Sequence, residues 1–139
     1  MDYLQMMRNI LSIISFSILF SVSSYAQNSD DASDVFSPIS KYISRGDAQC
    51  LSVWFSENLE IDMMGRPNNY SRSQASRVME SFFEEYPPRY FQIVHKSGSY
   101  PMNCAVGDME GGGYKFLVTI LVKTSDGGNA IQQIKIERE

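Results

Sequence analysis

The sequence contains few of the residues on which metal and nucleic-acid chemistry depend. It has one histidine, His95, and two cysteines in 139 residues, so a zinc site built from several histidines is excluded. The 12 basic side chains are outnumbered by 16 acidic ones, and no basic run is present to neutralise phosphates. We therefore expect no nucleic-acid surface, no metal and no other cofactor.

The sequence also lacks an apolar run of the roughly 20 residues that a membrane-spanning helix needs. The stretch from Ile10 to Val22 is shorter, follows Arg8, and leads to Ser24-Tyr25-Ala26, with small residues at the two positions that a signal peptidase reads. We therefore interpret residues 1–26 as a signal peptide, cleaved after Ala26, rather than an anchor. Because no cysteine follows to carry a lipid, the mature chain is expected to be periplasmic or secreted and not membrane-spanning.

No phosphate-binding glycine motif is present either. Gly111-Gly112-Gly113 lacks the Gly-x-Gly-x-x-Gly spacing and precedes no helix, so a hairpin loop is expected there. The sequence does contain enough apolar residues for a hydrophobic core, since 43% of residues are hydrophobic and 12% are aromatic. We expect a disordered leader over 27–33 and a single domain over 34–139.

The strongest structural signal lies near the C-terminus. Phe116 to Lys123 is almost wholly apolar or β-branched, which is typical of a central strand. After the turn signal at 125–129, Ile131 to Ile136 returns as its partner. Upstream, residues 89–96 and 102–106 also alternate as strands.

Helical spacing precedes these strands. It predicts a first helix over 35–43, closed by Gly46, and a second, capped by Asp47, that carries Trp54 and Phe55. Leu59 to Met63 alternates as a short strand, and 65–69 is expected to be a turn. Ser71 and Gln74 form a capping box for a long helix that ends at Pro87-Pro88. The order predicts an α+β fold, with helices on one face of a curved sheet.

Several segments resemble an exported bacterial family known as domain of unknown function 4783. They are Phe36-Ser37-Pro38-Ile39, Gly46-Asp47, Trp54-Phe55, Leu59-Glu60-Ile61-Asp62, Phe82-Phe83, 91–98 and 132–136. That family is similar in fold to the nuclear transport factor 2-like and cystatin-like superfamily. The resemblance implies a cone of three N-terminal helices packed on a curved antiparallel sheet, and relatives with this fold often pair through the sheet, which makes a homodimer a further expectation.

Asp62 is the candidate general base. Ketosteroid isomerases of the superfamily carry a catalytic aspartate at the end of the first strand, three residues before a glycine, and Asp62 stands in that relation to Gly65. By the same analogy Tyr42 is the hydrogen-bond donor nearby. Against this role, Asp62 alternates with Leu59 and Ile61 and should point away from their face, so we expect a solvated carboxylate.

His95 alternates with Phe91 and Ile93, which places it on the helix-facing side of its strand, but no nucleophile or second ligand accompanies it. The aromatic side chains Trp54, Phe82, Phe83 and Phe91 are expected to form either core or the wall of an apolar pocket at the open end of the cone. With Tyr42, Asp62 and His95 they make up the predicted ligand-binding set.

Cys50 and Cys104 both fall on apolar faces, and either a disulfide or two buried thiols fits the pattern. We expect an exported, non-enzymatic module of the cell envelope that binds or assembles with an envelope protein. The alternatives are a binder of a small apolar ligand, and a pocket isomerase, hydrolase or dehydratase that uses Asp62.

Overall fold

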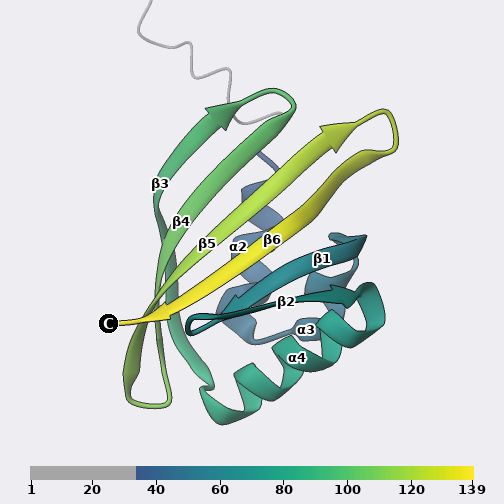
Figure 1. Cartoon of the computed structure of the whole chain (residues 1–139). Helices are drawn as coiled ribbons and strands as arrows, with labels where there is room; N and C mark the ends of the chain where they lie inside the picture. Colours follow the sequence, from purple (N-terminus) through teal and green to yellow (C-terminus); the bar gives the residue numbers. More distant parts are fainter. Residues whose placement is uncertain (1–33) are drawn as a thin grey trace, which may run out of the picture. The chain divides into compact units, whose positions relative to one another are not determined.

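The computed structural model describes residues 34–139; the predicted signal peptide and leader lie outside the described residues. The chain forms three helices and six strands there (Figure 1). In chain order the elements are α2 (Phe36–Arg45), α3 (Ala48–Ser52), β1 (Phe55–Met63), β2 (Arg66–Ser71), α4 (Arg72–Glu85), β3 (Pro88–Ser99), β4 (Met102–Gly111), β5 (Tyr114–Ser125) and β6 (Gly128–Arg138).

The six strands form one curved sheet in the order β2-β1-β6-β5-β4-β3. The predicted C-terminal hairpin is confirmed, since β5 and β6 pair antiparallel from Phe116 opposite Arg138 to Ser125 opposite Gly128. The prediction of a wholly antiparallel sheet is wrong at one pair, because β1 and β6 run parallel. The chain passes through β2, α4 and three further strands before β6 returns beside β1. Because this connection is long, β6 can pair with β1 in either the parallel or the antiparallel direction.

The first two helices meet at a tight corner. Helix α2 buries Phe36, Ile39 and Ile43 and ends at Gly46, whose φ of 63° is the left-handed conformation that glycine adopts most easily. Asp47 then caps α3 by accepting a hydrogen bond from the Cys50 backbone N–H at 3.0 Å. The sequence predicted both features.

The second helix is shorter than predicted. It has five residues and ends at Ser52, so only α2 and α4 are longer than two turns, and α4 follows two strands rather than preceding the sheet. Phe55, expected on the helix, is the first residue of β1 and is buried. Its apolar spacing from Leu51 fits a helix and a strand equally well, and pairing with Ile131 of β6 decides for the strand.

Helix α4 follows the sequence signals closely. Ser71 and Gln74 form the predicted capping box, and the helix ends just before Pro87. Ala75, Met79, Phe82 and Phe83 are buried, which gives α4 one apolar face along the sheet.

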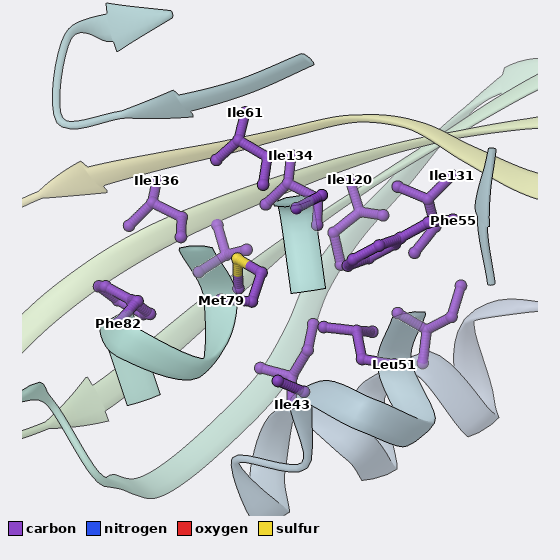
Figure 2. Packing of buried hydrophobic residues seen from close by; sticks show 14 of the residues in the cluster. Ile43, Leu51, Phe55, Ile61, Met79, Phe82, Ile120, Ile131, Ile134 and Ile136 are labelled. Atoms are coloured by element: carbon purple, nitrogen blue, oxygen red, sulfur yellow. The ribbon is translucent and has the colours of Figure 1, made fainter. Parts of the chain in front are cut away.

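The core lies between the helices and one face of the sheet. In Figure 2, side chains from the helices, including Ile43, Leu51, Met79 and Phe82, point toward isoleucines of the strands. The strand residues that meet them alternate along the sheet, and all of those in the following list are at most 2% exposed: Ile61, Phe116, Val118, Ile120, Val122, Ile131, Ile134 and Ile136. Within residues 34–139, no helix is both long enough and apolar enough to cross a membrane.

A candidate ligand cleft between α4 and the first hairpin

The first hairpin has an unusual turn. Residues 65–69 were expected to be a turn, but the turn consists of Met64 and Gly65 alone, and Arg66 to Ser71 form the edge strand β2. The prediction failed because proline and asparagine, although typical of turns, are tolerated on an edge strand that pairs on one side only. Both turn residues have positive φ, 54° at Met64 and 83° at Gly65, as a two-residue hairpin turn of type I′ requires.

Met64 is held in this turn at a conformational cost. A side chain in the left-handed region is disfavoured by roughly 1–2 kcal/mol, and asparagine or aspartate is the usual residue at this position. Its backbone N–H donates to the Ile136 carbonyl at 2.8 Å, which ties the hairpin tip to β6. Its thioether side chain is half-buried against the core. The fold thus holds a large apolar side chain at the tip of the hairpin.

A cleft of about 620 Å³ opens between this hairpin and α4, within the range of ligand-sized pockets. Met63 is an inward-facing residue of β1. Arg66 pairs with Met63, and Tyr70 pairs with Leu59, which also faces inward. All three side chains of the cleft therefore lie on the side of the hairpin that faces α4. The complete lining is Met63, Met64, Arg66, Tyr70, Val78, Ser81, Phe82, Glu85 and Tyr86.

Two residues that line the cleft, Phe82 and Tyr86, belong to an aromatic cluster. The Phe82 ring meets the Phe116 ring edge-on at a centroid distance of 5.3 Å, and the Tyr86 ring lies 4.9 Å from that of Phe116 and 5.7 Å from that of Tyr114. The guanidinium of Arg138 stacks 3.6 Å above the Tyr114 ring. These contacts hold the Phe82 and Tyr86 rings in place at the wall of the cleft.

The charged side chains of the cleft differ in the polar contacts that they make. Partial burial, together with a hydrogen bond to Glu85, raises the pKa of Tyr86, so its hydroxyl remains a donor and the Glu85 carboxylate an acceptor. Arg66 is exposed and makes no ion pair or side-chain hydrogen bond with any residue in 34–139. The cleft therefore combines an apolar floor with one unengaged cation at its rim.

A second concavity, of about 680 Å³, lies beside α3 and the start of α4. It is lined by polar or charged side chains throughout, including Arg72, whose Nε donates to the Phe55 carbonyl at 3.1 Å, and Arg77. Four serines contribute to its wall. With no apolar floor, this surface is a solvated groove rather than a pocket for an apolar molecule.

Of the seven residues predicted to bind a ligand, only Phe82 lines the cleft. Phe83 and Phe91 are 5% and 8% exposed within the core. Tyr42 and Trp54 are half-buried and pack against that core. The aromatic pattern thus predicted buried positions well, but most of these side chains are used for packing.

Asp62 and Tyr42 do not form a pair. Asp62 lies on β1 between the buried Ile61 and the half-buried Met63, so its side chain is on the sheet face away from the helices. Its cross-strand neighbours are Pro67 and Lys135. Tyr42 belongs to α2 on the other side of the sheet. The expectation of a solvated carboxylate is wrong for one Asp62 oxygen, Oδ1, which is buried and has no hydrogen-bond partner among residues 34–139.

His95 is exposed, and its expected orientation is wrong. The register of β3 against β4 shifts between Ile93, opposite Gly107, and His95, opposite Val106, so Val94 is an extra residue in a β-bulge. One extra residue turns every later side chain to the other face. His95 therefore leaves the helix-facing side that its spacing from Phe91 and Ile93 predicted.

The two cysteines are free thiols. Cys50 lies on α3, where a hydrogen bond with Asp47 raises the pKa of its thiol. Cys104 precedes the buried Ala105 on β4 and faces the opposite side of the sheet from the helices. Within residues 34–139, no three histidine, cysteine, aspartate or glutamate side chains group as metal ligands would.

The residues that define the cleft were missed because the hairpin was missed. Met63 and Tyr70 become neighbours of α4 only when β2 folds back on β1. The available signal was the pair Met64-Gly65 between Leu59–Met63 and a polar stretch, since a two-residue linker containing glycine is typical of a hairpin. Methionine at its first position weakened that signal.

The sequence profile described as "Domain of unknown function (DUF4783)" matches residues 36–137. The chain belongs to this family, as its sequence had indicated. No curated protein matches the sequence significantly.

Solved structures place the fold in the nuclear transport factor 2-like (NTF2-like) group. The chain superposes on a DUF4783 protein from Bacteroides ovatus with a TM-score of 0.71 at 21% identity, covering 74% of this chain and 94% of that one. A DUF4783 protein from Bacteroides uniformis gives 0.73 at 16% identity, covering 76% and 98%. A candidate dehydratase of the NTF2-like family from Streptomyces avermitilis gives 0.56 at 12%, covering 75% and 90%. At these identities the likenesses establish the α+β NTF2-like fold.

Proposed function

We propose that this protein is an exported, non-enzymatic binding module of the cell envelope that holds a small apolar ligand between α4 and the first hairpin. The observation that carries the proposal is the cleft of about 620 Å³, whose floor is formed by Met63, Met64, Val78 and Phe82. Methionine side chains are flexible and polarizable, so a surface rich in them adapts to apolar molecules of different shape.

The arrangement of acids supports a binding role over a catalytic one. Asp62 faces away from the cleft, and Glu85, the acid on its wall, is exposed. A general base needs both proximity to the substrate and a tuned environment. Export fits the predicted signal peptide, and in an envelope compartment a small binding module would meet apolar ligands or envelope proteins.

The direct test of the proposal is Val78→Glu. A carboxylate on the apolar wall should weaken binding of the neutral probe N-phenylnaphthylamine at least tenfold, because the probe would then have to desolvate the charge. Arg77→Gln is the matched control, since it changes the net charge by the same amount on the same helix but lies outside the cleft. Fluorescence titration of the mature chain, from Gln27 onward, and of both variants in the same chain measures the effect. Equal binding by all three proteins would refute the proposal.

Asp62→Asn separates the binder from the enzyme alternative. Because the carboxylate is on the other side of the sheet, the amide should leave probe affinity unchanged. Its Oδ1 is buried with no partner within 34–139, so a neutral amide in place of the charge should not lower the unfolding free energy. The readouts are urea denaturation and the same titration. A large loss of probe affinity would show that Asp62 acts on the ligand site after all.

A further inference from the structure

We infer that the ligand of the cleft is a free single-chain amphiphile with an anionic head, bound with its head at Arg66 and its tail along α4. This inference rests on the proposed function and adds the chemical class of the ligand. It follows from the way polar and apolar groups are distributed along the cleft, rather than from its volume.

The two ends of the cleft are chemically different. Arg66 stands opposite Met63 at the tip of the hairpin, whereas Tyr70 stands opposite Leu59 near the point where α4 begins. Helix α4 runs back along the hairpin, so Val78 lies toward the Tyr70 end and Tyr86 toward the tip. A ligand that fills the cleft thus has one end beside the guanidinium and the other beside Tyr70 and Val78.

The charges at the tip select the sign of the head group. Arg66 makes no ion pair within residues 34–139, not even with Glu85, the acid that shares the lining of the cleft with it. A guanidinium offers paired N–H donors that match a carboxylate or phosphate. The unmet interaction at this end of the cleft is therefore one that an anion satisfies.

The hairpin tip presents the cation and the apolar contacts together. Met63 and Met64 precede Arg66 by only a few residues, and the Met64 N–H bond to the Ile136 carbonyl fixes their position on the sheet. The left-handed Met64 is explained by this arrangement, because an asparagine would relieve the backbone but remove an apolar contact at the tip. A free chain is favoured over a membrane surface, since the net charge of −4 repels anionic bilayers.

Calorimetric titration of the mature chain, from Gln27 onward, with dodecanoate below its micelle concentration tests the inference. Dodecanoate should bind, and affinity should rise by about fourfold for each added methylene from octanoate upward, until the chain outgrows the cleft. Arg66→Gln should weaken dodecanoate binding roughly tenfold, the loss of a charge-assisted contact, and leave neutral dodecanol unaffected. Glu85→Gln should strengthen dodecanoate binding slightly, and Arg77→Gln, which removes the same charge as Arg66→Gln, should change it little.

Each contrary result identifies what has failed. Equal affinity for dodecanoate and dodecanol with no effect of Arg66→Gln would overturn the head-group inference and leave the apolar cleft standing. Tighter binding of dodecyltrimethylammonium than of dodecanoate would also overturn it. If neither dodecanoate, dodecanol nor N-phenylnaphthylamine bound, the proposed function itself would fall. Binding only to phosphatidylglycerol vesicles, with none of free dodecanoate, would overturn the choice of a free ligand.

Discussion

Helix α4 takes part in two regions that are built differently. Against the central strands, Met79 and Phe83 fill the interior and are at most 5% exposed. Against the β1–β2 hairpin, Val78 and Ser81 face a cleft. The difference lies in the strands that face the helix. Strands β5 and β6 supply buried side chains such as Phe116, Ile134 and Ile136, whereas the inward positions of β2 are Arg66, Asn68 and Tyr70. Where one side of an interface lacks apolar side chains, the elements do not close on each other.

The largest expected difference between the two regions is in unfolding free energy. Phe116→Ala removes a ring that is 1% exposed and contacts the rings of Phe82 and Tyr86. It should cost about 3–5 kcal/mol. Val78→Ala, at the wall of the cleft, should cost about 1 kcal/mol or less, since its side chain is already half in water. Urea denaturation of both variants measures the contrast, and similar losses would mean that the cleft is part of the core.

A smaller effect is expected at the hairpin tip. Met64→Asn relieves the left-handed backbone by about 1 kcal/mol and loses a half-buried thioether, so the melting temperature should stay within a few degrees of the wild type. Binding of N-phenylnaphthylamine should nevertheless weaken severalfold, because an apolar contact of the cleft is lost. Thermal denaturation and fluorescence titration give the two values. A fall in melting temperature of ten degrees or more would show that Met64 serves stability rather than binding.

The smallest effect on stability is expected away from the cleft, at the corner between α2 and α3. The hydrogen bond from the Cys50 N–H lowers the pKa of Asp47 in the folded state. Stabilisation by this carboxylate is therefore present above its unfolded pKa, about 3.9, and is lost as pH falls through the lower folded value. Asp47→Asn keeps an acceptor but does not titrate.

Melting curves of wild type and Asp47→Asn between pH 6 and about pH 2.5 test this assignment, over a range chosen to span the carboxylate pKa. The wild type should lose a few degrees more than the variant over the acid part of the range. Parallel curves would mean that the cap does not contribute to the stability of the corner.

Elements with a local signal could be predicted from the sequence, and those set by distant pairing could not. The β5–β6 hairpin, the Asp47 cap and the Ser71/Gln74 capping box follow from residues close together in the chain, and each is confirmed. Strand β2 exists because β1 pairs with it, and its own composition indicates a turn. The parallel β1–β6 pair and the bulge at Val94 that turns His95 outward depend on register across the sheet.

The candidate site was harder to predict than the fold for the same reason. The aromatic side chains that stand out in the sequence, Phe83 and Phe91 among them, are needed for the core and are buried. The residues that line the cleft form no recognisable sequence motif. Met64 and Arg66 come to lie in it only when the hairpin folds against α4. Local composition thus predicts burial, while a cleft reflects how well two separate elements fill the space between them.

The central claim is that ligands bind between α4 and the first hairpin, and amide chemical-shift mapping tests it most directly. Titrating the isotope-labelled protein with dodecanoate should shift the amide signals of Met63, Met64, Tyr70 and Val78, which surround the cleft. Signals from the opposite face of the sheet, such as those of Cys104 and Leu121, should not move. Shifts confined to that opposite face, or no shifts at dodecanoate concentrations just below micelle formation, would contradict the account.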